Sequence, residues 1–248
     1  NKNKAAEIAA LKGKHTEEQL SAILNRKPRI DKVVIKDAKQ RTFITNDESR
    51  DSLVNLVYDV TYGTVKKGVD NLVVLDDSIV RGTTLKQSIL KILDRLQPKK
   101  IVVVSSAPQI RYPDCYGIDM AVLKKFVAFE ATVALVRERG KEDFLNDLYK
   151  RAKEELLKPK EEQVNLVKEL YSSFSPEEVS EKIASMIRPK DLNAEFEIIY
   201  QSVEGLHAAC PEHKGDWYFS GNYPTPGGNK VSNQAFVNYM EGSNRRAY

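Results

Sequence analysis

The chain has 248 residues, enough for one large domain or for one domain with an appendage. Lys and Arg number 39 against 35 Asp and Glu; this net charge of +4 suits anionic substrates, but the chain lacks the concentrated basic stripe of a nucleic-acid binder. Its two cysteines, Cys115 and Cys210, give no disulfide framework, and no apolar run reaches membrane-spanning length. We therefore expect a cytoplasmic protein with neither nucleic-acid nor membrane partners.

The N-terminal third of the chain predicts helices and one short strand. Residues 1–27 are charged and Ala-rich and are expected to be helical, with a capping box at 16–19 (Thr-Glu-Glu-Gln). Residues 32–36 (Lys-Val-Val-Ile-Lys) predict a strand, which leads by a loop to 41–44 (Arg-Thr-Phe-Ile). A helix of moderate amphipathicity is expected over residues 47–58.

The most informative part of the sequence is residues 73–85 (Val-Val-Leu-Asp-Asp-Ser-Ile-Val-Arg-Gly-Thr-Thr-Leu). The apolar run 72–75 predicts a strand buried on both faces, as in a parallel sheet. Asp76 and Asp77 follow at its carboxyl end, where open α/β sheets place their ligands. Two carboxylates at this position favour binding of sugar hydroxyls or of Mg²⁺.

A turn of small and hydroxyl-bearing residues follows the two acids. Gly82, Thr83 and Thr84 lead into residues 84–96, which have the spacing of an amphipathic helix. Its N-terminus offers unpaired N–H groups and a partial positive charge, which suit a phosphate. On its own, an Asp-Asp pair usually marks only the end of a strand, and a Gly-Thr-Thr sequence usually only caps a helix. The joint pattern is harder to obtain by chance and lacks the Lys of a nucleotide-binding P-loop, so it favours a phosphorylated sugar.

A second strand is predicted at 101–104, and it completes a right-handed βαβ unit. Residues 115–119 predict a short further strand, and 122–139 have helical spacing. Residues 137–162 carry eight basic and eight acidic side chains, which predict a solvated helical appendage. A helix start at 175–178 (Ser-Pro-Glu-Glu) is followed by a strand at 196–200 and a short helix at 203–208.

Four segments resemble one known family. Residues 73–85 resemble the phosphoribosyl-pyrophosphate (PRPP) motif of type I phosphoribosyltransferases. Residues 106–120 (Ser-Ala-Pro-Gln-Ile-Arg-Tyr-Pro-Asp-Cys-Tyr-Gly-Ile-Asp-Met) resemble the segment after the next strand in amidophosphoribosyltransferases, the glutamine-dependent enzymes that open de novo purine synthesis. Residues 41–44 match the end of that family's flexible active-site loop, and 221–225 (Gly-Asn-Tyr-Pro-Thr) resemble its closing segment. The four matches are in the family's order and span about half of the chain.

The resemblance implies a fold and a division of the chain. The expected fold class is α/β, with a type I phosphoribosyltransferase-like parallel sheet flanked by helices. Residues 1–136 and 176–208 would form this domain, without the N-terminal part of the family fold. Residues 137–175 would be a helical insertion, and the Gly-, Pro- and Asn-rich segment 209–248 would be irregular.

The resemblance also implies an activity and its residues. The family transfers the phosphoribosyl group of PRPP to ammonia from glutamine and releases pyrophosphate. Asp76 and Asp77 would hold the ribose hydroxyls, directly or through Mg²⁺ as the cofactor. The implied partners are PRPP, purine nucleotides, a glutaminase domain elsewhere in the polypeptide and further copies of the chain. The 5′-phosphate would lie in a cradle formed by Ser78, Arg81, Gly82, Thr83 and Thr84, and Lys36 and Arg41 would reach the pyrophosphate.

The chain also departs from the family pattern. The family's N-terminal nucleophilic Cys and its pyrophosphate-binding loop are not found, and Gln40 stands where Gly is expected before Arg41. Two cysteines cannot supply the four ligands of the iron–sulfur cluster that some members carry, and the spacing of Cys210 with His207 and His213 fits no standard zinc pattern. These departures leave open a non-catalytic sensor of PRPP or nucleotides. A salvage enzyme acting on a free base is a third possibility, and residues 110–120 argue against it.

Overall fold

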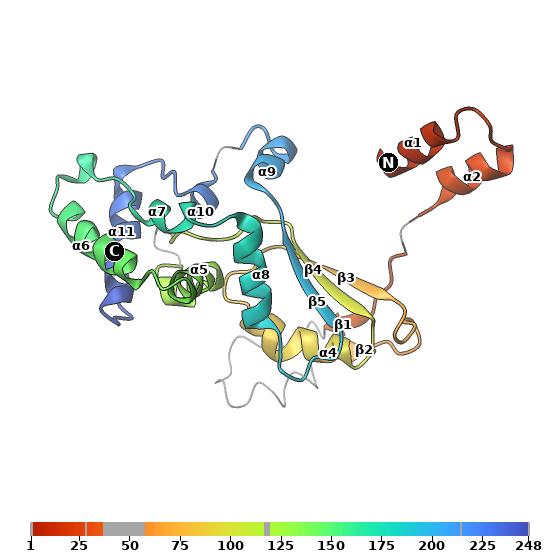
Figure 1. The fold of residues 1–248 in the computed structure, drawn as a ribbon, viewed down its shortest axis with the longest axis horizontal. Coiled ribbons are helices and arrows are strands. Elements are labelled where there is room, and N and C mark those ends of the chain that lie inside the picture. Colours follow the sequence, from red (N-terminus) through yellow and green to blue (C-terminus); the bar gives the residue numbers. More distant parts are fainter. Residues whose placement is uncertain (1, 28, 37–57, 117–119, 214, 248) are drawn as a thin grey trace.

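The protein is an α/β structure with a parallel sheet flanked by helices (Figure 1). The computed structural model describes residues 2–27, 29–36, 58–116, 120–213 and 215–247. A second, two-stranded antiparallel ribbon pairs β1 (Val34–Lys36) with β2 (Tyr58–Val60). The residues expected at 41–44, most of the helix expected at 47–58 and three of the residues expected in a strand at 115–119 lie outside the described ranges.

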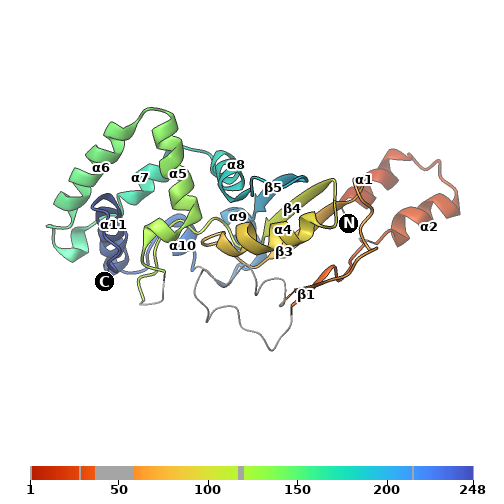
Figure 2. The ribbon, with the colours of Figure 1, turned by 90° about the horizontal axis from the view of Figure 1, so that it is seen from below.

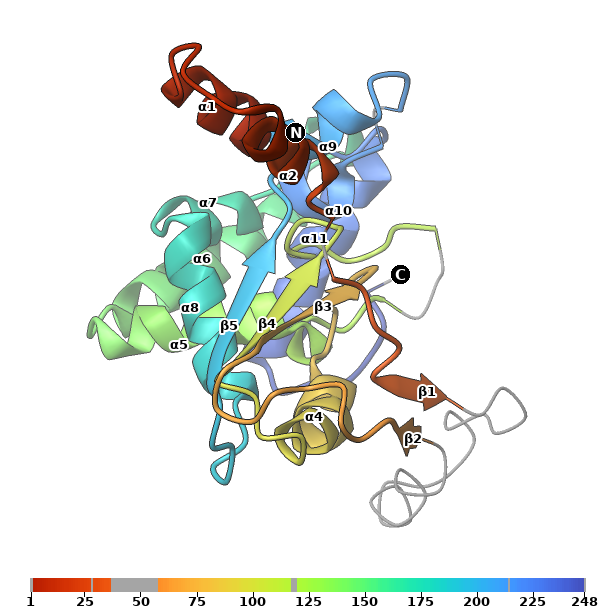
Figure 3. The same cartoon turned by 90° about the vertical axis from the view of Figure 1, so that its right-hand side faces the viewer.

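The parallel sheet has three strands in sequential order. β3 (Asn71–Asp76) pairs with β4 (Lys100–Ser105), and β4 pairs with β5 (Glu195–Tyr200). Figure 3 shows the three strands side by side. Their register aligns Asp76 with Ser105 and Ser105 with Tyr200, so the three carboxyl ends lie in one row. The three strands predicted from the sequence at 72–75, 101–104 and 196–200 are confirmed, each one or two residues longer than expected.

The connection from β3 to β4 is the predicted helix. The chain becomes helical at Thr83, forms one π-helical turn, η3 (Leu85–Ile89), and continues as α4 (Leu90–Asp94). The buried side chains of this helix are Leu85, Ser88, Leu90, Ile92 and Leu93. At its end, the Asp94 carboxylate accepts hydrogen bonds from the backbone N–H groups of Asn193 and Ala194, at 3.1 and 3.0 Å, and so ties the helix to the start of β5.

The expectation that β3 is buried on both faces is wrong. Val73 is 64% exposed and Leu75 is 78% exposed, whereas Leu72 and Val74 are half-buried against the core. The reason is topological: the strands follow in sequential order and βαβ crossovers are right-handed, so both crossovers pass over the same face. The helices therefore cover one face of the sheet.

Six helical segments connect β4 to β5. The helix expected over 122–139 is divided, because Phe126 has an extended backbone (φ −94°, ψ 114°) between two segments. The capping box predicted at Ser175 is confirmed: its side chain accepts the N–H of Glu178, and the Glu178 carboxylate accepts the N–H of Ser175. The segments are η4 (Leu123–Lys125), α5 (Val127–Glu138), α6 (Glu142–Glu155), η5 (Lys160–Glu162), α7 (Val167–Ser172) and α8 (Pro176–Ile187).

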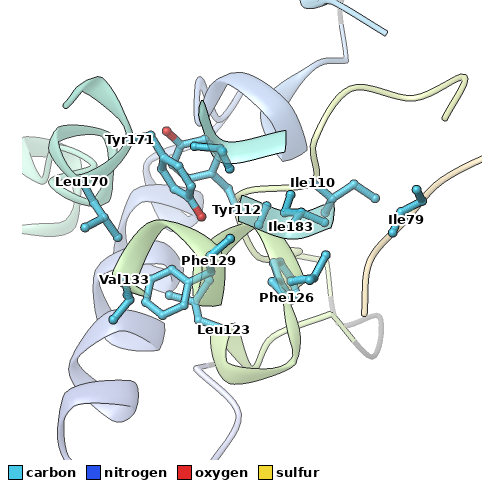
Figure 4. Packing of buried hydrophobic residues seen from close by; sticks show 14 of the residues in the cluster. Ile79, Ile110, Tyr112, Leu123, Phe126, Phe129, Val133, Leu170, Tyr171 and Ile183 are labelled. Carbon is cyan, nitrogen blue, oxygen red and sulfur yellow. The ribbon is translucent and has the colours of Figure 1, made fainter. Parts of the chain in front are cut away.

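The segment 137–162 is largely helical, as predicted, but it is not a solvated appendage. On α6, Leu145, Leu148 and Ala152 are buried, and they belong to the same hydrophobic cluster as the residues of α5. Leu170 of α7 and Val133 of α5 lie in this cluster (Figure 4). The steps of three and four between the buried residues of α6 form one apolar face, which the dense charges around them concealed.

The C-terminal segment is not irregular, contrary to expectation. It contains α10 (Trp217–Ser220) and α11 (Pro226–Met240), and α11 packs against α6. Pro226 stands at the first turn of α11, where its missing N–H costs nothing. The two glycines in the first turn of the helix suggested a loop, but burial of Val231, Ala235 and Phe236 outweighs their low helix propensity.

The N-terminal residues form two helices that project away from the sheet (Figures 1 and 2). They are α1 (Lys2–Ala10) and α2 (Glu17–Asn25), and the predicted capping box between Thr16 and Gln19 is present. The predicted short helix after β5 is α9 (Val203–Ala209). Among the described residues, no helix is long and apolar enough to span a membrane.

The burial of α6 predicts a large stability loss on truncation. Leu148→Ala removes a side chain that is 0% exposed, and we expect the free energy of unfolding to fall by about 2–5 kcal/mol. Leu157→Ala is the matched control, since Leu157 is 86% exposed, and it should change stability by less than about 0.5 kcal/mol. Urea unfolding followed by circular dichroism measures both. Equal effects would mean that α6 is solvated after all.

Candidate functional site

The candidate site is at the carboxyl ends of the parallel strands. Asp76 is the last residue of β3, and Asp77 follows it in the turn. Asp76 is half-buried and Asp77 is exposed. In register with Asp76 are Ser105 and Tyr200, the last residues of β4 and β5. Because parallel strands end at the same edge of a sheet, two carboxylates, a hydroxyl and a phenol lie along that edge here.

Local hydrogen bonds hold the two carboxylates. One carboxylate oxygen (Oδ1) of Asp76 accepts the backbone N–H of Asp77 at 3.0 Å, and Oδ1 of Asp77 accepts the N–H of Ser78 at 2.7 Å. From the end of β4, the Ser106 hydroxyl donates to the backbone carbonyls of Asp76 and Asp77, at 3.1 and 3.2 Å. The N–H groups of Ser106 and Ala107 also donate to these carbonyls. Both acids are thus fixed at backbone level by the neighbouring strand.

The two acids differ in their electrostatic surroundings. Burial raises the pKa of Asp76, and the charge of Asp77 beside it adds to this effect, although the hydrogen bond from the Asp77 N–H opposes it. Burial also raises the pKa of Tyr200, and the charge of Asp76 contributes. The Tyr200 hydroxyl is buried and has no hydrogen-bond partner among the described residues. Asp76 therefore holds its proton more tightly than an ordinary carboxyl group does, and Tyr200 stays a neutral donor.

The turn from Asp77 to Gly82 is anchored at its middle and exposed at its end. Ile79 is buried in the core, and the carbonyl of Val80 accepts the N–H of Val127 at 2.8 Å. Arg81, Thr83 and Thr84 are exposed, Ser78 and Gly82 are half-buried, and the helix begins at Thr83. The predicted cradle residues therefore do lie together, around the start of one helix.

Glycine is required at position 82 by the backbone conformation there and by the side chain that packs against it. Its φ of +68° is a left-handed conformation that other residues rarely adopt. A Cβ added there would overlap Cδ1 of Ile187, the last residue of α8. Lys86 also binds the end of α8, because its Nζ donates to the carbonyl of Met186 at 2.9 Å. The turn is thus closely packed against the end of α8.

Two predicted site residues are not placed. Lys36 ends β1, but its side chain is outside the described part of the structure, and so is all of Arg41. The antiparallel pairing of β1 with β2 brings together the two ends of the segment that carries Arg41. The roles of Lys36 and Arg41 stay predictions.

Sequence reasoning missed Ser106, Tyr200 and Ile187 as residues that shape the site. Ser106 follows β4 directly and Tyr200 ends β5, so the rule that parallel strands end at one edge was a usable signal for both. No such signal existed for Ile187, whose contact with Gly82 joins residues more than 100 positions apart.

The segment 106–116 acts as a packed support beside the site. The N–H groups of Arg111 and Tyr112 donate to the carbonyl of Tyr218, and Tyr112 lies edge to face with Tyr171 at a ring separation of 5.2 Å (Figure 4). Asp114, which is fully buried, accepts the Tyr218 hydroxyl at 2.6 Å. These contacts join α7 and α10 to the chain that leaves β4. On α10, the ring of Tyr218 contacts the rings of Trp217 and Phe219.

Asp76 and Asp77 are the residues that could hold a metal ion. Hard cations such as Mg²⁺ prefer carboxylate oxygens and commonly use one or two carboxylates together with oxygens of a phosphorylated substrate. Within the described ranges, no group of three or more His, Cys, Asp or Glu side chains is arranged to hold a metal ion. The pair therefore fits Mg²⁺ that is shared with a substrate, and it does not form an all-protein cage.

Comparison with known proteins relates part of the chain to one family. No family model matches the chain. It is 48% identical over 59 residues to an amidophosphoribosyltransferase of Pasteurella multocida, 44% over 68 residues to that of Haemophilus influenzae and 41% over 68 residues to that of Escherichia coli. These stretches cover 24–27% of this chain and 12–13% of each relative, so the matches span a small part of the relatives' length. Over this stretch the chain is related in sequence to the phosphoribosyltransferase portion of amidophosphoribosyltransferases.

One solved structure also aligns with the chain. It is a glutamine PRPP amidotransferase from B. subtilis complexed with ADP and GMP. The alignment has a TM-score of 0.44 and 24% sequence identity, and it covers 78% of this chain and 32% of that one.

The packing of Gly82 predicts a graded pair of substitutions. Gly140 also has a left-handed backbone (φ +62°) but has open space around it, so Gly140→Ala should cost only the backbone strain, about 1–2 kcal/mol. Gly82→Ala adds the overlap with Ile187 and should lower the free energy of unfolding by more than Gly140→Ala. Urea denaturation of both variants measures the difference. Equal losses in the free energy of unfolding would mean that the Ile187 side chain can move aside without lowering stability.

The raised pKa of Asp76 predicts a pH-dependent effect of its removal. The pKa of Asp76 is higher in the folded state than in the unfolded state, so the folded state binds the proton more tightly. The free energy of unfolding therefore falls as the pH rises from the unfolded-state pKa to the folded-state pKa. Asp76→Asn should therefore raise the melting temperature at pH 7. The gain should disappear at about pH 3, where Asp76 is protonated in both states. Thermal melts at the two pH values test this, and a gain that is independent of pH would contradict it.

Proposed function

We propose that this chain is the PRPP-binding portion of a longer polypeptide that makes 5-phosphoribosylamine. The nitrogen would be ammonia released from glutamine by a glutaminase domain elsewhere in that polypeptide, and the reaction would be the first step of de novo purine biosynthesis. One observation carries the proposal: Asp76 and Asp77 end a parallel strand and lead through a glycine turn to a helix start, in a chain related to amidophosphoribosyltransferases.

The chemistry is a substitution at the anomeric carbon of PRPP. The bond from this carbon to the pyrophosphate oxygen breaks, a bond to the ammonia nitrogen forms, and the nitrogen loses one proton. The transition state has oxocarbenium character, as in glycoside chemistry. Asp76 and Asp77 would accept hydrogen bonds from the ribose 2′- and 3′-hydroxyls and place negative charge near the developing cation. Because Ser106 holds both acids at backbone level, the ribose would be bound in a fixed orientation.

The 5′-phosphate would bind at the start of the helix. The backbone N–H groups near Gly82, Thr83 and Thr84 and the hydroxyls of Ser78, Thr83 and Thr84 would hold it, with the positive charge of Arg81 nearby. Gly82 has no Cβ, so the backbone can come close to a phosphate. Purine nucleotides carry the same ribose 5′-phosphate, and we propose that they compete for this cradle.

Mg²⁺ would neutralise part of the negative charge of the pyrophosphate. Asp76 and Asp77 would hold it together with oxygens of PRPP. Lys36 and Arg41 would contact the pyrophosphate from the protein. The family resemblance further suggests a homo-oligomer.

A second candidate function is non-catalytic sensing of PRPP or nucleotides. It is favoured by Gln40, which stands where the family has Gly in its flexible loop, and by the lack of a recognisable pyrophosphate-binding loop in the sequence. A sensor would use the cradle and the acids for binding alone.

The first experiment measures pyrophosphate release from PRPP and Mg²⁺ by the longest natural polypeptide that contains this chain. Ammonia and glutamine are tested separately as nitrogen donors. Release with both donors is the expected result. Release with neither donor, from a folded sample that binds nucleotides, would replace the proposal with the sensor.

In that polypeptide, Asp76→Asn together with Asp77→Asn should lower kcat/KM with ammonia by about 10²–10³-fold or more, because charge stabilisation of the transition state is lost. Nucleotide binding to the phosphate cradle should survive, and isothermal calorimetry with a nucleoside monophosphate measures it. Asp191→Asn is a control on an exposed acid away from the site and should leave both quantities unchanged. Unchanged turnover in the double variant would remove the two acids from the mechanism.

A further inference from the structure

One cavity in the described part of the chain lies away from the two acids. It has a volume of about 860 Å³ and runs between β5 and α8, whereas Asp76 is on β3, at the opposite edge of the sheet. The chain leaving β4 and the start of α9 close it at the carboxyl end of β5. The lining residues from these two connections include Pro108, Gln109, Arg111, Ser202, Val203 and Glu204.

One side of this groove is the outer edge of β5. The N–H groups of Glu195 and Gln201 donate to the carbonyls of Lys99, just before β4, and of Ser105, its last residue, both at 3.1 Å. Successive residues of a strand face opposite edges, so Phe196, Ile198 and Tyr200 direct their N–H and C=O groups outward. Among the described residues no other strand pairs with this edge, and all three residues line the groove. A row of backbone donors and acceptors therefore faces the cavity, and such a row is a template for another strand.

The other side is one face of α8, and its residues are small. Ser180, Ala184 and Ser185 line the groove, while Val179, Ile183 and Ile187 on the adjacent face are buried in the core. The small side chains leave space for the cavity between α8 and β5. The opening is bounded by α8 along its length and by Phe219 and the 108–111 segment at one end. This shape suits a single extended chain and not the flat edge of a second sheet.

The charges of the lining select the occupant. Four carboxylates, Glu177, Glu181, Glu197 and Glu204, line the groove with two guanidinium groups. Glu197 is paired with Lys100, and Arg111 and Arg188 donate to the uncharged oxygens of Gln109 and Leu192, so both guanidinium groups keep their charge. On α8, Glu177 and Glu181 give the lining its excess of negative charge.

We propose that this groove binds one extended peptide segment with basic side chains, which adds to the sheet as a strand beside β5. Backbone hydrogen bonds to Phe196, Ile198 and Tyr200 would supply affinity, and basic side chains toward Glu177 and Glu181 would supply selectivity. A segment of six residues is about 20 Å long, which matches the six residues of β5. The inference does not depend on the proposed phosphoribosyl chemistry, because none of the groups it uses belongs to the cradle.

The test measures binding of a labelled, acetylated heptapeptide, Lys-Thr-Val-Lys-Val-Thr-Lys, by fluorescence anisotropy. We expect saturable binding to the full chain. Methylation of alternate backbone nitrogens of the peptide should weaken binding by tenfold or more, since it removes the strand hydrogen bonds. Replacing its Lys residues with Glu should weaken binding by a similar factor. No binding up to millimolar peptide, or equal binding of the methylated peptide, would overturn the proposal.

Variants of α8 locate the binding. Ser185→Trp fills the groove from an exposed position and should abolish binding, whereas Ala208→Trp, exposed on α9 and outside the lining, should not. Glu181→Gln should weaken binding of the basic peptide but not of an uncharged analogue, and this variant does not alter packing. Binding that survives Ser185→Trp in a folded sample would overturn the proposal. Sedimentation showing a dimer of the free chain that Ser185→Trp dissociates would also overturn it, because a second copy would then be the occupant.

Discussion

The in-register parallel pairing of three strands determines most of what this molecule presents to solvent. Since β3, β4 and β5 all run in one direction, their last residues, Asp76, Ser105 and Tyr200, meet at one edge. Since they follow one another in sequential order, their right-handed crossovers cover one face and leave the other open. The position of the two acids and the exposure of Val73 and Leu75 are thus consequences of the same pairing.

The helices do more than cover the sheet. The end of α8 packs beneath the Gly82 turn through Ile187, and its groove-facing side runs beside β5. One helix therefore supports the proposed phosphate cradle at one end and forms one wall of the proposed peptide groove along its side. The two proposed binding functions lie at opposite edges of the sheet, and α8 is the element they share.

The helical segment 137–175 and α11 form one packed unit with the helices that follow β4. Arg151 on α6 makes a bidentate pair with Glu169 on α7, at 2.9 and 2.8 Å, and Tyr149 on α6 donates to the Glu241 carboxylate at 2.8 Å. Partly exposed ion pairs of this kind add little stability by themselves. The buried Leu148, Leu170 and Phe236 supply the apolar contacts that join these helices. The unit is therefore held mainly by packing, and the charged pairs fix its register.

The sequence by itself determined the features that depend on neighbouring residues. These are the strand at β3 with its two terminal acids, the helix that starts at Thr83, the capping boxes at Thr16 and Ser175, and hence most of the candidate site. Only the tertiary structure decided the features that depend on which distant segments meet. The open face of β3 follows from strand order, the burial of α6 and the helical state of α11 from their contact with each other, and the requirement for Gly82 from Ile187 on α8. Local propensity and spacing act over a few residues, whereas burial is set by partners far along the chain, so a charged or glycine-containing segment becomes a core helix only once its partner is in place.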